Sequence, residues 1–199
     1  ISGHWDHYKD GMFVLGDEEK DKEVYALRPM TCPFQYYVYK AEQHSYRDLP
    51  IRLGETSTLF RNEASGEMHG LIRVRQFTIS EGHLMCTPEQ LEDEFRKCLE
   101  LAIFMLKTLG LYEDVSYRFS QWDPNDRAKY IGTEEQWNEA QGLMERILNH
   151  LEIPYEIGIG EAAFYGPKLD IQIKNVYGKE DTLITIQIDQ MLAEQFGMV

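Results

Sequence analysis

Residues 60–78, with the sequence FRNEASGEMHGLIRVRQFT, decide the fold of this chain. The segment ASGEMHG at 64–70 is typical of a hairpin loop, so the segments on either side are expected to be antiparallel strands. Side chains alternate between the two faces of a strand. One face of the hairpin is therefore expected to carry Arg61 and Glu63 from the first strand, and Arg73, Arg75, Phe77, Glu81 and His83 from the second.

This set of side chains is suited to bind a nucleotide. Guanidinium groups hold phosphate oxygens in a bidentate manner, and an arginine or phenylalanine face stacks on a base. A solvent-exposed strand face with cross-strand ion pairs would show the same alternation of arginine and glutamate. The spacing alone leaves both interpretations open.

Helices and further strands surround this hairpin in the sequence. Two amphipathic segments begin with a capping-box pattern of threonine and glutamine, one at Thr87 and one at Thr133, and another helix is expected over residues 33–44. Short turns between strands favour antiparallel pairing, so we expect an α+β fold with a mainly antiparallel sheet flanked by helices. The strands of this sheet are predicted from alternating apolar and polar residues at 115–120, 169–174 and 184–189.

The composition limits the class of protein. A chain of 199 residues is long enough for one domain with a buried core, and we expect a single domain over 1–199. No apolar run approaches the roughly 18 residues of a membrane span, and the first residues do not resemble a signal peptide. A net charge of −14 argues against general affinity for nucleic acids, and three cysteines without CxxC spacing favour a reducing, cytoplasmic setting.

A second candidate cluster lies in the segment AFYGPK at 163–168. The Gly-Pro turn is expected to present Tyr165 and Lys168 at the end of the sheet, where a phenol and an ammonium group could hold an amino acid or a phosphate. A surface turn with an exposed lysine is the alternative interpretation.

Three other residues have side chains suited to chemistry. Cys32 and His83 are good zinc ligands by type, but two ligands far apart in the sequence do not make a site. His4 could accept a proton near neutral pH, and it could equally be a packing residue beside Trp5.

Five ordered segments together give the chain a family resemblance. They are SGHWDHYKD at 2–10, RPMTCPF at 28–34, SYRDLPIR at 45–52, the hairpin segment at 60–78 and GEAAFYGPKLD at 160–170. This set closely resembles the catalytic domain of threonyl-tRNA synthetase, a class II aminoacyl-tRNA synthetase. The resemblance implies an enzyme that condenses threonine with ATP to threonyl-adenylate and then esterifies the 3′ end of its tRNA. It also implies ATP, threonine and a threonine tRNA as partners, Mg²⁺ with the ATP, and a homodimeric parent protein.

The hairpin resembles motif 2 of the class II synthetases, which binds ATP. By that resemblance Arg61 would hold the α-phosphate and the reacting carboxylate, and Glu63 would read the adenine. Arg73 would reach the outer phosphates, and Phe77 would stack on the base. Met30 would also contact ATP.

The same family binds a zinc ion through one cysteine and two histidines, and threonine chelates it through its amino group and hydroxyl. Cys32 and His83 match two of these ligands, and the third is expected beyond Val199. Valine lacks the hydroxyl and so cannot complete the metal's coordination.

Further roles follow from the resemblance only. Tyr165 and Gln187 would line the threonine pocket, and Glu81 would bind the threonine hydroxyl where the family usually has aspartate. Lys168 would lie beside the adenylate and the tRNA end, and His4 would help deprotonate the terminal ribose.

Departures from the family pattern keep a second function open. Ile79 and Gln190 differ from the family's usual glutamine and phenylalanine. Motif 1, motif 3, and the editing and anticodon-binding regions are expected to lie outside 1–199. The alternative is a non-catalytic synthetase-like paralogue that binds an amino acid, a nucleotide or a protein partner.

Overall fold

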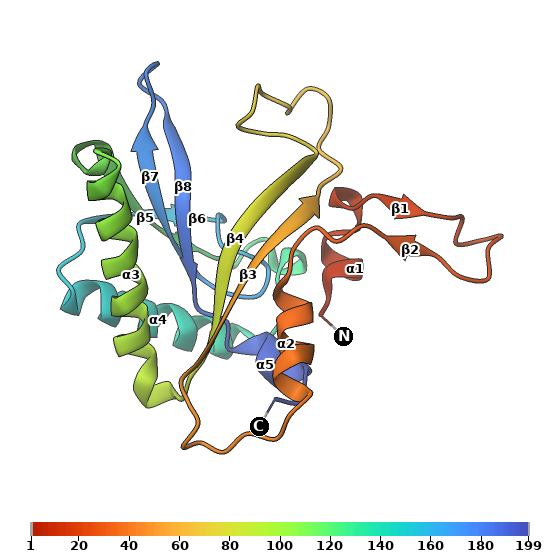
Figure 1. The fold of residues 1–199 in the computed structure, drawn as a ribbon, viewed down its shortest axis with the longest axis horizontal. Helices are drawn as coiled ribbons and strands as arrows, with labels where there is room; N and C mark the ends of the chain where they lie inside the picture. Colours follow the sequence, from red (N-terminus) through yellow and green to blue (C-terminus); the bar gives the residue numbers. More distant parts are fainter. Residues whose placement is uncertain (1, 199) are drawn as a thin grey trace. The chain divides into compact units, whose positions relative to one another are not determined.

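The computed structural model describes residues 2–198 of the chain (Figure 1). The chain divides into two compact units, the first extending to Met85 and the second comprising Cys86–Gly197. The expectation of a single domain over 1–199 stays a prediction. None of the helices in residues 2–198 combines the length and the apolar character that a membrane span needs.

The first unit is built around a long two-stranded antiparallel hairpin, β3 and β4. A second, short pair of strands, β1 and β2, lies earlier in the chain. The elements of this unit are α1 (His4–His7), η1 (Lys9–Gly11), β1 (Val14–Leu15), β2 (Tyr25–Ala26), α2 (Cys32–Lys40), β3 (Ile51–Phe60) and β4 (Gln76–Met85).

The hairpin confirms the predicted antiparallel pairing, and within β4 it confirms that Phe77, Glu81 and His83 share one face. The prediction that Arg61, Glu63, Arg73 and Arg75 continue this face on the strands was wrong, because these residues lie outside β3 and β4 and Arg73 and Arg75 are exposed. In the register of the two strands Phe77 lies opposite Leu59, and Glu81 lies opposite Glu55. On β4 the odd-numbered residues from Phe77 to His83 are half-buried, whereas the even-numbered residues from Gln76 to Gly82 are exposed. The face predicted to carry the functional groups is therefore the more covered one.

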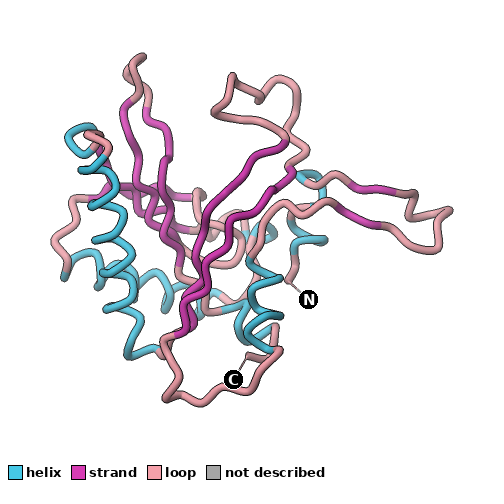
Figure 2. The backbone as a smooth tube through the Cα atoms, in the orientation of Figure 1, coloured by secondary structure: helices cyan, strands magenta, loops and turns pink. Residues whose placement is uncertain are grey.

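The strands are shorter than the sequence predicted, because β3 ends at Phe60 and β4 begins at Gln76. A backbone hydrogen bond from Arg61 to the carbonyl of Arg75, 2.9 Å long, still joins the two sides, but the chain turns immediately afterwards. Residues 61–75 form a long connection with loop structure (Figure 2). Arg61 and Arg73 therefore lie on loop backbone beyond the regular strands.

The helix α2 ends at Lys40, so the predicted extension to His44 was wrong. The His44 ring stacks on Tyr39 with 4.4 Å between ring centres, and its Nε2 lies 2.8 Å from the Tyr39 carbonyl oxygen. This carbonyl would accept from the backbone of residue 43 if the helix continued. The His44 side chain takes the place of that backbone donor at the end of the helix.

The second unit contains a four-stranded sheet in the order β6-β5-β7-β8. The pairs β5–β7 and β7–β8 are antiparallel, as predicted, but β5 and β6 are parallel. A parallel neighbour needs a long crossover, and here the segment that contains α4 supplies it. The elements are η2 (Pro88–Gln90), α3 (Leu91–Thr108), η3 (Tyr112–Asp114), β5 (Val115–Gln121), η4 (Arg127–Lys129), α4 (Glu134–His150), β6 (Tyr155–Ile159), β7 (Lys168–Lys174), β8 (Glu180–Gln187) and α5 (Met191–Gln195).

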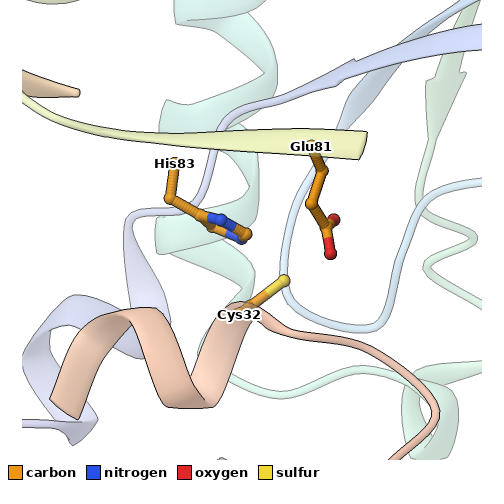
Figure 3. Close-up of side chains that lie close together, drawn as sticks. All are labelled: Cys32, Glu81 and His83. Atoms are coloured by element: carbon orange, nitrogen blue, oxygen red, sulfur yellow. The ribbon is translucent and has the colours of Figure 1, made fainter. Parts of the chain in front are cut away.

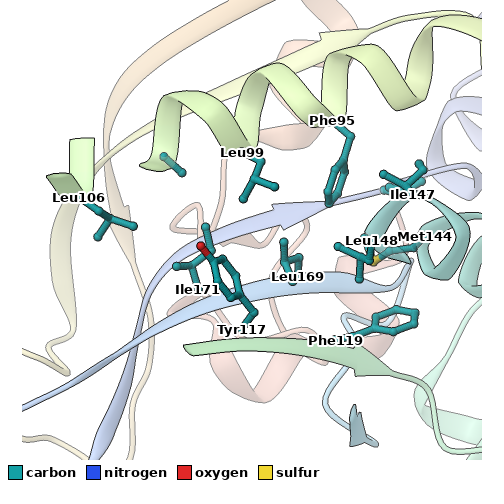
Figure 4. Close-up of a cluster of buried hydrophobic side chains, with 12 residues drawn as sticks. Phe95, Leu99, Leu106, Tyr117, Phe119, Met144, Ile147, Leu148, Leu169 and Ile171 are labelled. Atoms are coloured by element: carbon teal, nitrogen blue, oxygen red, sulfur yellow. The ribbon is translucent and has the colours of Figure 1, made fainter. Parts of the chain in front are cut away.

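The core of the second unit lies between this sheet and the helices α3 and α4 (Figure 4). Phe95 and Leu99 point from α3 towards Leu169 and Ile171 of β7, and Met144 of α4 packs into the same cluster. Both predicted capping boxes are present, and the first of them precedes the turn η2 rather than α3 itself. The α+β class and the flanking helices are confirmed.

Candidate active site

Three potential metal ligands meet in the first unit. Cys32 is the first residue of α2, while Glu81 and His83 lie two residues apart on the same face of β4. One ligand atom from each residue lies within 4.8 Å of the others. The sulfur of Cys32, the carboxylate of Glu81 and the ring of His83 point towards a common point (Figure 3). The structure therefore brings the two sequence-predicted zinc ligands together.

The protonation state of His83 suits a metal ligand. Burial lowers the pKa of His83 below its usual value of 6.5, although the negative charges of Glu81 and Glu55 act in the opposite direction. The imidazole is therefore neutral near pH 7, which is the form that binds metals. Its Nδ1 is buried and has no hydrogen-bond partner within the described part of the chain.

The donor set fits a zinc-type ion. Sulfur and imidazole nitrogen are preferred zinc ligands, and a carboxylate oxygen is a third accepted type. A buried imidazole nitrogen without a hydrogen bond is costly, and a bound metal ion would remove that cost. The first turn of α2 also places Cys32 where the helix dipole favours negative charge.

The neighbouring carboxylates are held by defined partners. Thr31, which is fully buried, donates a hydrogen bond from Oγ1 to Oε1 of Glu81. Glu55 accepts hydrogen bonds from Gln35 and Arg28, and the Arg28 contact measures 3.2 Å. The bond from Gln35, which is the largest cause, lowers the pKa of Glu55.

Two arginine pairs form at the other end of the hairpin. The guanidinium carbon of Arg61 lies 5.0 Å from the ring centre of Phe77, and Nε of Arg61 donates to the Pro29 carbonyl over 3.3 Å. Arg73 donates from Nε to Oε2 of Glu63 over 2.9 Å. The structure thus brings Arg61 to Phe77 and Arg73 to Glu63. Phe77 lies on β4, and the other three residues lie on the loop that precedes it.

His4 and Met30 are in direct contact, through Nε2 and Sδ. His4 is buried, and this burial is the main reason why its pKa falls from 6.5 to about 4. The ring is therefore neutral at pH 7. A neutral imidazole can accept a proton, but a pKa this low makes it a weak base.

The remaining candidates lie in the second unit. Tyr165 is buried and donates its hydroxyl proton to Oε1 of Gln187. Lys168, at the start of β7, donates to Oδ2 of Asp170 over 2.5 Å, and its side chain is 21 % exposed. The interpretation of this segment as a surface turn with an exposed lysine is therefore wrong.

Asp170 is a residue that the sequence did not single out for a role. It is 2 % exposed and also accepts hydrogen bonds from Ser120 over 2.6 Å and from Thr185 over 2.8 Å. The alternating pattern of β7 could have indicated a role for Asp170. A carboxylate on a strand face needs hydrogen-bond partners if that face is covered. Asp170 fixes the position of the Lys168 ammonium group.

Comparison with known proteins identifies the family. Over residues 13–199 the chain matches the family described as tRNA synthetase class II core domain (G, H, P, S and T). The chain belongs to this family. Its class II fold is confirmed by solved structures that resemble it over nearly its whole length.

Two relatives of this class II core domain carry the same name. A protein of Clostridium botulinum (strain Eklund 17B / Type B) named Threonine--tRNA ligase is 72 % identical over 198 residues. This match covers 100 % of the chain and 31 % of the relative, so the chain spans about a third of the relative's length. A relative of the same name from Staphylococcus carnosus is 45 % identical over 197 residues, which are 99 % of the chain and 30 % of that relative.

A solved structure shares the fold closely. It is titled as the RNA binding domain of threonyl-tRNA synthetase from Cryptosporidium parvum and matches with a TM-score of 0.87 at 37 % identity. The match covers 98 % of this class II core domain and 47 % of that chain.

One feature of the candidate site was missed by sequence reasoning. Glu81 was assigned to substrate binding only, although it shares a strand face with His83 and lies beside Cys32 in the structure. The spacing of two residues between Glu81 and His83 was the available signal, because it places both on one face of a strand.

Proposed function

We propose that the chain is the catalytic core of a threonine–tRNA ligase. It activates threonine with ATP to threonyl-adenylate and pyrophosphate, and then transfers threonine to the 3′ end of its tRNA. The proposal is supported by identity of up to 72 % along the whole chain with relatives named Threonine--tRNA ligase.

One observation in the structure carries the proposal. Strand β4 carries Phe77, which contacts Arg61 of the adjoining loop, near one end, and it carries Glu81 and His83 further along, where they meet Cys32 of α2. Phe77 and Glu81 are four positions apart on β4, which corresponds to about 13 Å along a strand. This distance gives room for an adenine, a ribose phosphate and an amino acid side by side, which is the layout of an aminoacyl-adenylate.

The nucleotide part of the site acts by charge and position. Phe77 offers its ring to the adenine, and Glu63 and Met30 complete the nucleotide contacts. Arg61, held by the Pro29 carbonyl, offsets the negative charge that develops at the α-phosphate during attack. Arg73 leaves Glu63 to reach the outer phosphates, which arrive with Mg²⁺.

The amino-acid part of the site selects threonine. Cys32 and His83 would hold a zinc ion, with a further ligand beyond Val199, and such an ion fixes an amino group and a hydroxyl. By the family resemblance Tyr165 and Gln187, which form a hydrogen-bonded pair, would bind the threonine. A site built to bind the hydroxyl rejects valine strongly, because valine leaves polar groups unpaired.

The transfer step needs a group near the reacting ribose. By the family resemblance Lys168, whose ammonium group Asp170 positions, would lie beside the adenylate and the tRNA end, and neutral His4 would help to deprotonate the terminal ribose as a weak base. The family resemblance also implies a homodimer and a cytoplasmic location, and sedimentation of the complete protein tests the first of these.

Amino-acid-dependent exchange of pyrophosphate into ATP by the complete protein tests the proposal. Threonine is expected to support exchange, and valine to be poorer by about 10⁴-fold in kcat/KM. Threonyl-tRNA formation with total tRNA tests the second step. Binding of threonine or nucleotide without any exchange would favour the non-catalytic alternative.

A further inference from the structure

The carboxylate of Glu81 occupies an unusual position for a group that only contacts substrate. It extends from β4 towards Cys32, at the start of α2 (Figure 3). Its ligand oxygen lies within 4.8 Å of the ligand atoms of Cys32 and His83. Two tetrahedral zinc ligands are roughly 3.3–3.8 Å apart, so a small side-chain rotation would bring all three onto one ion.

The charges around this cluster favour the binding of a cation. A carboxylate in a half-buried place is costly unless a positive charge or hydrogen bonds compensate it, and a bound cation would compensate it here. Arg28 forms its ion pair with Glu55, and within residues 2–198 the structure gives Glu81 no ion pair with lysine or arginine. The hydrogen bond from Thr31 uses Oε1 of Glu81 and leaves Oε2 for a metal.

The length of the Glu81 side chain also favours its binding to the metal. Glutamate is one methylene longer than aspartate, which adds about 1.5 Å to the arm. The added length extends the carboxylate from the strand towards the level of the Cys32 sulfur.

We propose that Glu81 is itself a ligand of the metal ion, so that Cys32, Glu81 and His83 form a sulfur, oxygen and nitrogen set. This inference rests on the proposed function only for the identity of the metal as zinc. Thr31 orients the carboxylate through Oε1 while Oε2 binds the ion, which is how metal-bound carboxylates are commonly held.

Metal affinity of the complete protein tests this assignment. Zinc is removed with a chelator, and the dissociation constant of added zinc is measured by competition with a coloured chelator. Glu81→Gln is expected to raise the zinc Kd by at least about tenfold and to change the visible spectrum of the cobalt-substituted protein. Cys32→Ala is the positive control and is expected to lose the metal.

Glu55→Gln is the matched control, because Glu55 also influences the pKa of His83 through its charge and lies opposite Glu81 in the register. Its zinc Kd is expected to stay within about twofold of wild type, because a group outside the coordination sphere acts only through screened charge. Equal weakening by Glu55→Gln and Glu81→Gln, or no change in Glu81→Gln, overturns the proposal.

A second variant keeps the test decisive if Glu81→Gln folds poorly. Glu81→Asp preserves the charge and shortens the arm, so its zinc affinity is expected to fall below wild type. A zinc Kd of Glu81→Asp equal to that of the wild type would contradict the proposal that ligation depends on the length of the Glu81 side chain. Threonine-dependent pyrophosphate exchange is measured in parallel. Unchanged zinc binding in the Glu81 variants, with normal exchange by the wild-type protein, removes only the ligand assignment. Missing exchange by the wild-type protein, with the expected changes in zinc affinity, removes only the proposed function.

Discussion

The guanidinium carbon of Arg61 lies 5.0 Å from the centre of the Phe77 ring, and this contact joins a loop residue to the second residue of strand β4. The contact orders both side chains before any nucleotide arrives, because the ring supports the cation from one side. Preordered groups lose less conformational entropy when a ligand binds.

Phe77→Leu is expected to raise the KM for ATP by about tenfold or more, since base stacking on an aromatic ring contributes about 1–3 kcal/mol. Pyrophosphate exchange at varied ATP concentrations measures this. Phe34→Leu is the control, because Phe34 also lies near an arginine, Arg28 at 5.9 Å, but is 48 % exposed on α2. Equal effects of the two changes would contradict the stacking role.

Arg61→Ala is expected to lower kcat for adenylate formation by about 10²–10³-fold, because it removes a positive charge aimed at the α-phosphate. Single-turnover formation of threonyl-adenylate is the measurement. Arg47→Ala removes an exposed arginine that contacts only the loop residues Ser45 and Tyr46 in the described structure and is expected to leave kcat unchanged. A normal exchange rate in Arg61→Ala would remove Arg61 from the reaction.

Cys32→Ala is expected to lose bound zinc and threonine binding together, because the thiolate is the strongest ligand of the set. Metal analysis and threonine titration of the complete protein measure the two losses. Cys86→Ala is the matched control, because burial raises the pKa of Cys86 and keeps it a thiol. Full zinc occupancy in Cys32→Ala would exclude Cys32 from the site.

His4 makes stability depend on pH. Its pKa is about 4 in the folded protein and 6.5 as the ordinary value, so the unfolded chain binds the proton more readily. This contribution is fully present above pH 6.5 and is lost as the pH falls towards 4. His4→Gln should therefore reduce the loss of unfolding free energy between pH 7 and pH 5 by about 1–2 kcal/mol in urea titrations. An unchanged pH dependence in this variant would contradict the burial of a neutral ring.

Gly166 is needed for close packing of the turn after Tyr165. A Cβ atom at this position would lie 2.2 Å from the backbone oxygen of Ile188. Gly166→Ala is therefore expected to destabilise the protein by about 1–3 kcal/mol, measured by thermal unfolding. Gly142→Ala, on α4 with its nearest contact at 3.5 Å, is expected to stabilise it by about 0.5–1 kcal/mol. Equal midpoints for the two variants would contradict the close approach.

The local elements were predictable because their signals are local. The capping boxes at Thr87 and Thr133 and the alternation on β7 and β8 each depend on residues a few positions apart. The end of α2 was not predictable, because the His44 side chain replaces a helical hydrogen bond. The parallel pairing of β5 and β6 was also missed, since it depends on the path of the chain through α4.

The sequence by itself determined which side chains share a face of the hairpin, because the period of a strand is two and Phe77, Glu81 and His83 all lie on odd positions. It also determined the family, through ordered motifs along the chain. Only the tertiary structure decided that α2 begins beside this face, which brings Cys32 to Glu81 and His83. The physical reason is that contacts between residues some 50 positions apart depend on packing of whole elements, which no local pattern encodes.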